Sequence, residues 1–163
     1  MIAFVALGSN VGDPRATVLR AMDELEKLSR TPLKRSSLWE TDPVDCPPGS
    51  PLFINAMVGL DPLPGETPET LLKKLKALEI EFGRKPKSVL NEPRPLDLDL
   101  IAFGTEIRTG PELLLPHPRA HERRFVLAPW NEIAPDYVMP SQKLSVGALL
   151  NRLGSSQFAR RSS

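Results

Sequence analysis

The stretch that decides the fold alternates apolar and acidic residues, and it reads Pro93-Arg94-Pro95-Leu96-Asp97-Leu98-Asp99-Leu100-Ile101. Successive side chains of a β-strand point to opposite faces, so this alternation predicts a strand whose leucines share one face. Asp97 and Asp99 would then share the other face, with their Cβ atoms roughly 6 to 7 Å apart. Both carboxylates could reach the same one or two cations. The spacing alone equally fits a solvated edge strand whose charges only prevent aggregation.

Basic residues flank this acidic pair on both sides. Arg94 lies just upstream, and a downstream cluster contains Arg119, His121, Arg123 and Arg124. Guanidinium groups bind phosphate oxygens in a bidentate manner, and paired acids hold divalent cations. The combination therefore favours phosphoryl-type transfer over a merely solvated surface.

Length and charge restrict the remaining possibilities. The chain has 163 residues, which suits one domain, and we expect that domain to span residues 1–153 with a flexible tail at 154–163. Lys plus Arg number 21 and Asp plus Glu number 20, so neither nucleic acid nor a membrane is the expected partner. The single cysteine, Cys46, excludes an internal disulfide. The apolar residues 1–7 lack a basic leader and are expected to form a buried strand, in a cytoplasmic protein.

Apolar spacing, capping residues and prolines predict an α+β fold. The expected elements in chain order are strand 2–7, helix 14–29, strand 33–41, strand 52–60, helix 68–82 and strand 96–101. This order is typical of a ferredoxin-like sandwich, with a mostly antiparallel sheet and both helices on one face. The C-terminal extension should hold a hairpin around 104–106 and short helices at 123–130 and 146–153.

Two further stretches have open interpretations at this point. Phe53 and Asn55 share one face of a predicted strand, where a ring and a carboxamide could bind a flat heterocycle, although core packing also explains Phe53. Residues 8–10, Gly-Ser-Asn, could form a turn or a phosphate cradle. A turn is favoured because the Lys-Ser/Thr of a P-loop is missing.

Several blocks resemble the 6-hydroxymethyl-7,8-dihydropterin pyrophosphokinase family of the folate pathway. They are ALGSNVGD (6–13), TDPV (41–44), FINA (53–56), FGR (82–84), PRPLDLDL (93–100) and LPHPRAHERRFVL (115–127). The resemblance implies a ferredoxin-like core and a kinase-type transferase that moves pyrophosphate from ATP to the pterin hydroxymethyl group, releasing AMP. It implies a small enzyme with ATP and the pterin as its partners, which we expect to be a monomer.

The resemblance also implies roles for individual residues. Catalysis would involve Arg84, Arg94, Asp97 and Asp99, with two Mg²⁺ ions held by the two aspartates. The implied pterin-binding residues are Thr41, Val44, Phe53, Asn55 and Phe125, with the pterin between the two rings. The implied ATP-binding residues are Glu79, Arg84, Lys87, Arg94, Leu100, His117 and Arg123.

The loop before the acidic pair departs from the family pattern. Members commonly carry a second basic residue where Pro86 stands, and a basic-Trp-Gly run where residues 90–92 read Leu-Asn-Glu. Lys85 or Lys87 could replace the missing charge, although lysine lacks the planar fork of arginine. Closure of this loop over ATP is therefore the feature most expected to differ in this chain.

Two rival functions remain open from the sequence. In a transition-metal hydrolase, His117 and His121 would join Asp97 and Asp99 as ligands, although Pro118 disfavours a helical histidine pair. In a ferredoxin-like sensor or interaction domain, no catalytic group would be needed. Such a module has no use for paired acids facing arginines.

Overall fold

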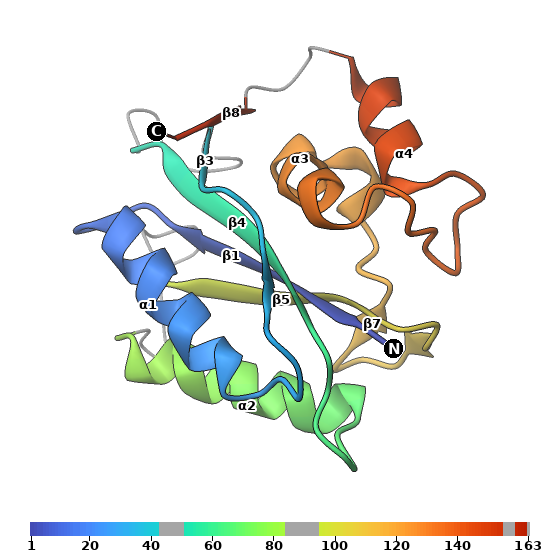
Figure 1. Ribbon diagram of the computed structural model, residues 1–163, viewed down its shortest axis with the longest axis horizontal. Coiled ribbons are helices and arrows are strands. Elements are labelled where there is room, and N and C mark those ends of the chain that lie inside the picture. The colour runs from blue at the N-terminus through green and yellow to red at the C-terminus, as the bar shows by residue number, and fades with distance from the viewer. Residues whose placement is uncertain (43–50, 84–94, 155–158, 163) are drawn as a thin grey trace.

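The fold is known from a computed structural model that describes residues 1–42, 51–83, 95–154 and 159–162. Figure 1 shows its helices and strands. In chain order they are β1 (Ala3–Ser9), α1 (Pro14–Glu26), β2 (Lys34–Arg35), β3 (Trp39–Thr41), β4 (Phe53–Leu60), α2 (Pro68–Glu81), β5 (Asp97–Phe103), β6 (Arg108–Thr109), β7 (Leu114–Leu115), the 3₁₀ helix η1 (Ala120–Glu122), α3 (Arg124–Ile133), α4 (Val146–Leu153) and β8 (Ala159–Arg161).

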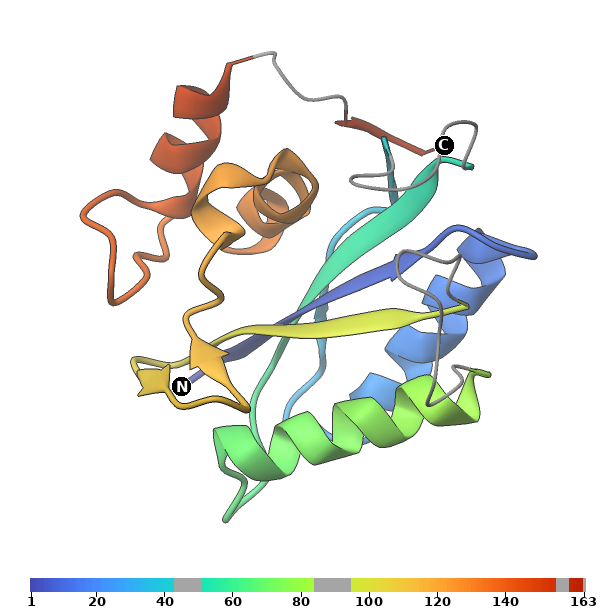
Figure 2. The ribbon, with the colours of Figure 1, turned by 180° about the vertical axis from the view of Figure 1, so that it is seen from behind.

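A twisted antiparallel sheet forms the middle layer of the molecule. Its strand order is β5-β1-β4-β3-β8, and β2 also pairs with β4. The longest pairing joins β1 to β4, from Ala3 opposite Leu60 to Ser9 opposite Ile54. Helices α1 and α2 lie on one face of this sheet, while α3 and α4 lie on the other, as the opposite views in Figures 1 and 2 show. The predicted antiparallel sheet, with the first two helices on one face, is confirmed.

Each face of the sheet packs into its own hydrophobic core. The first core lies against α1 and α2 and includes Val5, Val18, Leu71 and Leu98. The second lies against α3 and α4 and includes Phe4, Met57, Ile101 and Trp130. Within the second core, the rings of Phe4, Trp130 and Tyr137 pack at tilted angles with centroids 5.0 to 5.5 Å apart. A sheet that is buried on both faces is held rigidly, and this rigidity suits it to carry a site.

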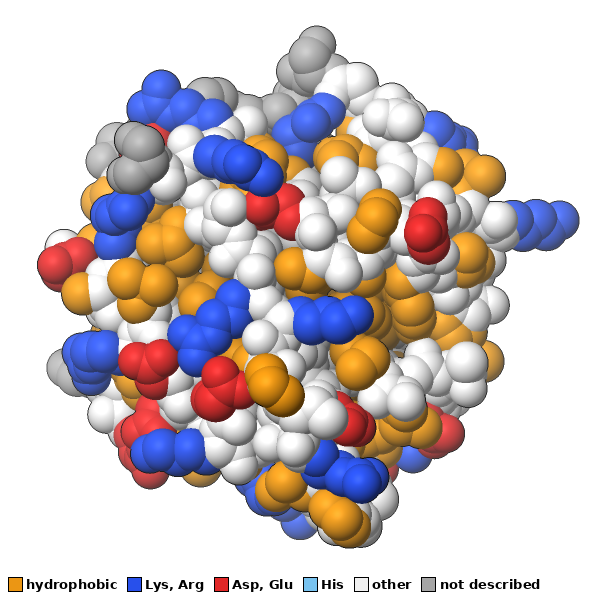
Figure 3. Space-filling model, viewed as in Figure 1, with side chains coloured by type: hydrophobic (Ala, Val, Ile, Leu, Met, Phe, Trp, Pro, Cys, Tyr) orange, Lys and Arg blue, Asp and Glu red, His pale blue; other side chains and the backbone are white. Residues whose placement is uncertain are grey.

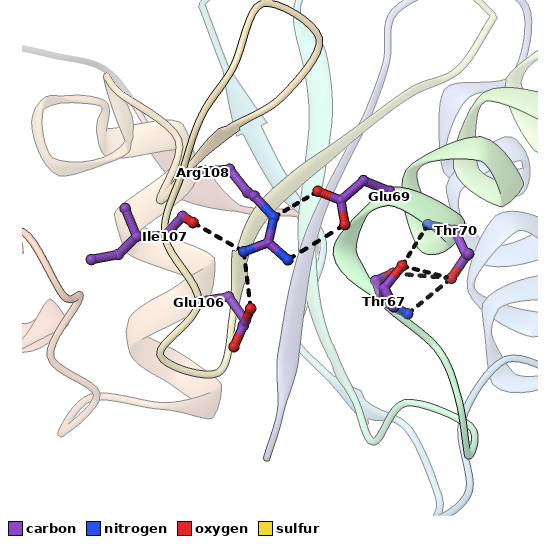
Figure 4. A network of polar contacts seen from close by, with 6 residues as sticks. All are labelled: Thr67, Glu69, Thr70, Glu106, Ile107 and Arg108. Carbon is purple, nitrogen blue, oxygen red and sulfur yellow. Dashed lines mark hydrogen bonds and ion pairs between the residues drawn. The ribbon is translucent and has the colours of Figure 1, made fainter.

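The helix starts follow the capping residues that the sequence predicts. Asp13 accepts a hydrogen bond from the Ala16 amide at 3.2 Å, and Thr67 accepts one from the Thr70 amide at 3.1 Å. Each cap satisfies an amide that has no partner within its helix. Figure 4 shows the Thr67 cap beside Arg108, which donates to Glu69 at 2.6 Å and so joins the β6–β7 hairpin to α2.

Four local predictions are wrong. Helix α1 ends at Glu26, and not near residue 29. The predicted strand 33–41 is interrupted between β2 and β3, because the Ser36 hydroxyl, and not a backbone carbonyl, accepts the Met57 amide at 2.9 Å. Residues 104–105 form only a turn, and the hairpin ladder joins β6 to β7 further along the chain.

The fourth correction concerns the C-terminal tail. Residues 159–161 form strand β8 beside β3, where a flexible tail was expected. The pairing is reinforced by an ion pair between Arg160 and Glu40 at 2.7 Å and by the Ser162 amide, which donates to the Leu38 carbonyl at 2.8 Å. Backbone pairing of this kind depends on an open sheet edge, which composition alone does not reveal.

The surface carries charges of both signs. On the face shown in Figure 3, Lys and Arg side chains lie among Asp and Glu side chains. Within the described residues, no helix is long and apolar enough to cross a membrane.

Candidate active site

Strand β5 places the acidic pair as the alternation predicts. Leu98 and Leu100 are buried in the first core, whereas Asp97 is half-buried and Asp99 is exposed. Asp97 lies opposite Gly8 and Asp99 lies opposite Ala6 on β1. The two carboxylates therefore lie on the face of the sheet that α3 covers, and the predicted sharing of one face is confirmed.

Glu79 fixes the backbone of β5 between the two acids. Its Oε2 accepts a hydrogen bond from the Leu98 amide at 2.9 Å, and its residue is only 7% exposed. Because β5 is an edge strand, this amide points away from the sheet and needs a partner from another element. Glu79, a predicted ATP-binding residue, therefore holds the strand that carries the acids.

A straight row of residues crosses the sheet from the acidic pair to the far edge. The strand register places each member directly opposite the next: Asp97 on β5, Gly8 on β1, Asn55 on β4, Trp39 on β3 and Arg161 on β8. Directly opposite residues point to the same face. Neighbouring strands are about 4.8 Å apart, so Asp97 and Asn55 lie about 10 Å apart. We call this set the Gly8 row.

Asn55 is buried, and its carboxamide is oriented by two neighbours. The Thr41 hydroxyl donates to Asn55 Oδ1, and Asn55 Nδ2 donates to the Leu7 carbonyl at 3.4 Å. Each amide atom keeps capacity for one further bond, since the oxygen has two lone pairs and the nitrogen has two hydrogens. Asn55 can therefore present a donor and an acceptor side by side to a planar ligand.

Gly8 has no side chain and lies in the row between Asp97 and Asn55. A Cβ atom placed on Gly8 would lie 2.9 Å from Asn55 Nδ2 and 3.7 Å from Phe53 Cδ1. A side chain at this position would therefore push against the carboxamide. A glycine at this position therefore leaves room for the Asn55 carboxamide and places no side chain between the acids and the amide.

Two partly exposed rings lie on the same side of the sheet. Phe53 lies opposite Thr41 and is not fully buried, and Phe125 on α3 packs only partly against the second core. Among the described residues, ring contacts join Phe4, Trp130 and Tyr137, and neither Phe53 nor Phe125 takes part in them. The Arg123 guanidinium lies over the Phe125 ring, 5.5 Å from its centroid.

His117 lies next to the basic residues of the downstream cluster. Burial and the positive charges of Arg123 and Arg119 lower the pKa of His117 below its ordinary value of 6.5. Its Nδ1 accepts the Arg119 amide at 3.3 Å, and its own amide donates to the Ile101 carbonyl at 2.8 Å. The imidazole is therefore neutral at neutral pH, and its backbone is attached to the strand of the acidic pair.

The remaining predicted site residues divide into two groups. The Leu100 side chain is 3% exposed in the first core, so a ligand could reach this residue only through its main chain. Val44, Arg84, Lys87 and Arg94 lie outside the described residues, as does the loop with Pro86.

The described residues give no support to a transition-metal centre. Among them, no three His, Cys, Asp or Glu side chains come together in a group that could hold a metal ion. A set made of His117, His121 and the two aspartates is therefore not assembled. Mg²⁺ has a different requirement, because it is commonly bound by one or two carboxylates together with substrate phosphates and water. Asp97 and Asp99 fit that donor set.

Sequence reasoning did not assign the roles of three residues that shape this region, namely Gly8, Trp39 and Glu132. Residues 8–10 were expected to form a turn, but Gly8 and Ser9 belong to strand β1. Glu132 on α3 accepts a hydrogen bond from Trp39 Nε1 at 2.6 Å. A glycine that ends an apolar strand is a weak signal for close approach of a ligand. No local pattern indicates the contact between Trp39 and Glu132, since 93 residues separate them.

The sequence is similar to those of known proteins. Residues 4–135 match the family model of 7,8-dihydro-6-hydroxymethylpterin-pyrophosphokinase, or HPPK. The chain belongs to the HPPK family. It is 39% identical over 138 residues to the 2-amino-4-hydroxy-6-hydroxymethyldihydropteridine pyrophosphokinase of Pseudomonas aeruginosa, covering 84% of this chain and 83% of the relative. It is 41% identical over 134 residues to the HPPK of Bacillus subtilis, covering 81% and 77% respectively.

Other relatives are longer than this chain. The alignment with the folic acid synthesis protein fol1 of Pneumocystis carinii covers 92% of this chain but 20% of fol1, at 34% identity. Among solved structures, the Plasmodium falciparum HPPK-DHPS with pteroate superposes with a TM-score of 0.70 at 15% identity, covering 93% of this chain and 42% of that one. This likeness shows that the HPPK fold is shared.

Proposed function

We propose that this protein transfers a pyrophosphoryl group from ATP to the hydroxymethyl oxygen of 6-hydroxymethyl-7,8-dihydropterin and releases AMP. The observation that carries the proposal is the Gly8 row, in which Asp97 and Asn55 lie on one face about 10 Å apart with a side-chain-free position between them. The strand order β5-β1-β4-β3, with its two βαβ halves, also supports a ferredoxin-like core.

The pterin site would be built around Asn55. Its carboxamide, oriented by Thr41 and the Leu7 carbonyl, would bind the amide-like edge of the pterin. Phe53 and Phe125 would stack on the two faces of the ring. The absence of a side chain at Gly8 lets the ring lie close to the sheet, with its hydroxymethyl group directed toward the acids.

The nucleotide would lie on the acidic side of the row. Asp97 and Asp99 would hold Mg²⁺ together with phosphate oxygens, and Glu79 would keep their strand in place through the Leu98 amide. When bound, Mg²⁺ supplies positive charge that neutralises the triphosphate and stabilises the departing AMP. Arg123 and neutral His117 would complete the nucleotide site, with Arg84, Lys87 and Arg94 expected from the sequence.

The reaction needs no covalent intermediate. The hydroxymethyl oxygen forms a bond to the β-phosphorus, the bond to the bridging oxygen of the α-phosphate breaks, and the electron pair leaves with AMP. The hydroxyl proton is released to solvent. Catalysis by this arrangement is mainly positioning and electrostatic stabilisation.

The test uses the reduced pterin, ATP and Mg²⁺, with nucleotide products separated by chromatography. We expect AMP to form in equal amount to the pterin diphosphate. ADP as the sole product, or no turnover, would refute the proposal. Asp97→Asn and Asp99→Asn should remove nearly all turnover while the fold is retained, because the amide keeps the shape of the side chain but not its charge. Asp136→Asn, at an exposed position away from the row, is the matched control.

A further inference from the structure

The Glu132 carboxylate accepts hydrogen bonds from three separate parts of the chain. Its carboxylate accepts the Ser37 amide at 3.0 Å, the Ser37 hydroxyl at 2.8 Å, Trp39 Nε1 at 2.6 Å and Arg161 Nη2 at 2.8 Å. The side chain is only 15% exposed. One carboxylate on α3 thus joins the helix to the β2–β3 connection, to β3 and to β8.

The surroundings keep this carboxylate ionised. Burial raises the pKa of Glu132, but the hydrogen bonds from Trp39 and Ser37 and the charge of Arg161 outweigh burial, and the pKa lies below its ordinary value of 4.5. Hydrogen bonds to a charged acceptor are stronger than those between neutral groups. The contact is therefore a firm attachment between α3 and the sheet.

This attachment acts at the outer end of the Gly8 row. Trp39 lies directly opposite Asn55 on one side and directly opposite Arg161 on the other. Glu132 contacts both Trp39 and Arg161, so it holds the two row members that follow Asn55. Thr41, which orients the Asn55 carboxamide, lies on the same short strand as Trp39.

The same helix carries the opposite wall of the site. Phe125 and Glu132 are seven residues apart on α3, which places them on the same side of the helix and about 10 Å apart along its axis. Pro129 lies between them and cannot donate a helix hydrogen bond, so the helix is less stiff here than an uninterrupted one, but holding Glu132 against β3 still limits how far Phe125 can lie from the strands that carry Phe53 and Asn55.

We propose that Glu132 is a positioning residue for pterin binding, which attaches α3 to β3 and so sets the spacing between Phe125 and the Thr41–Asn55 pair. The proposal rests on the proposed function, since it concerns the pterin site of that reaction. It assigns no chemical step to Glu132. Arg123, expected in the nucleotide site, precedes the same helix, but the acidic pair lies at the other end of the row, so loosening this attachment should weaken pterin binding much more than ATP binding.

The test compares Glu132→Gln with Glu40→Gln by steady-state kinetics. Glu40 also lies on β3 and pairs with Arg160 of β8 at 2.7 Å, a contact that joins two strands and does not involve α3, so it is a matched control. For Glu132→Gln we expect the KM for pterin to rise roughly tenfold, because apparent affinity falls with the fraction of molecules that hold the binding-competent spacing. The KM for ATP and kcat should stay within about twofold of the unaltered enzyme, and Glu40→Gln should leave all three constants unchanged.

The experiment distinguishes failure of the proposed function from failure of the positioning role of Glu132. An unaltered enzyme that forms no AMP would refute the proposed function itself, whatever the variants do. If the unaltered enzyme is active, an unchanged KM for pterin in Glu132→Gln, or equal rises for pterin and ATP, overturns the positioning role. Thermal unfolding identifies a temperature at which each variant is folded. Should Glu132→Gln not fold, Trp39→Phe removes one donor and decides the question by the same selective rise in the KM for pterin.

Discussion

The replacement of Gly8 by alanine gives the sharpest test of the Gly8 row. The added Cβ would lie 2.9 Å from Asn55 Nδ2, whereas ordinary contacts between nonbonded heavy atoms are about 3.5 to 4.0 Å. The Asn55 amide must therefore move by more than about half an ångström. Its bond to the Leu7 carbonyl is already 3.4 Å long, so this displacement breaks it.

The Gly8→Ala substitution is expected to weaken pterin binding. A displaced amide loses about 0.5 to 1.5 kcal/mol per hydrogen bond, and crowding in a packed region adds about 1 to 3 kcal/mol. If about 1.4 to 2.8 kcal/mol of this is lost from the enzyme–pterin complex, the KM for pterin rises about ten- to a hundredfold. The KM for ATP should not change, since the proposed nucleotide site is on the other side of Gly8.

Initial rates of AMP formation at varied pterin and fixed saturating ATP measure this effect. Gly59→Ala is the control, because Gly59 lies on the same face of β4 and a Cβ there would meet Ile2 Cγ2 at 3.1 Å, at the end of the strand remote from Asn55. Both variants should lose some stability, but only Gly8→Ala should lose pterin affinity. Equal KM values for pterin in the two variants would refute the placement of the pterin against Gly8.

Three further predictions concern stability, each measured by urea denaturation. Because the pKa of His117 is lowered in the folded state, the unfolded state binds the proton more readily. The free energy of unfolding should therefore fall as pH drops through 6.5 toward the folded pKa. In His117→Gln this dependence of stability on pH should be weaker. Glu79→Ala should lower the free energy of unfolding by about 1 to 3 kcal/mol, because it leaves the Leu98 amide without this acceptor, and Glu79→Gln should cost less than half as much. Thr67→Ala should cost about 1 kcal/mol through loss of the α2 cap, with Thr67→Ser largely restoring it. Three results would each contradict the corresponding contact: the opposite pH dependence for His117, a larger loss of stability in Glu79→Gln than in Glu79→Ala, or no recovery of stability in Thr67→Ser.

The sequence predicted features that depend on neighbours along the chain. Alternation in residues 96–100 correctly separated the buried leucines from the two acids, and the capping residues Asp13 and Thr67 correctly marked the starts of α1 and α2. The alternation ends at a bulge, where the pairing with β1 shifts between Phe4 and Val5, and both Ile101 and Ala102 pack in the second core. A bulge depends on the partner strand, so the local pattern could not predict it.

The sequence could select residues of the candidate site but could not show how they are arranged in space. Asp97, Asn55 and Thr41 could be selected by residue type and family resemblance, but their alignment across neighbouring strands is a matter of register. The tail was expected to be flexible because its composition is polar, yet Arg161 completes the row by pairing with Trp39. Its partner strand lies about 120 residues away, as the contact between Arg160 and Glu40 shows.

The sequence by itself determined the alternation of strands and helices from β1 to β5, the sharing of one face by the two acids, and the family, because periodicity, capping and motifs are local properties of the chain. Only the tertiary structure decided that a glycine at position 8 makes room for the Asn55 carboxamide, that Glu79 holds the strand of the acids, and that Glu132 attaches α3 to the far end of the row. These are contacts between residues distant in sequence. They form only when strand register and helix packing bring their side chains within hydrogen-bond distance.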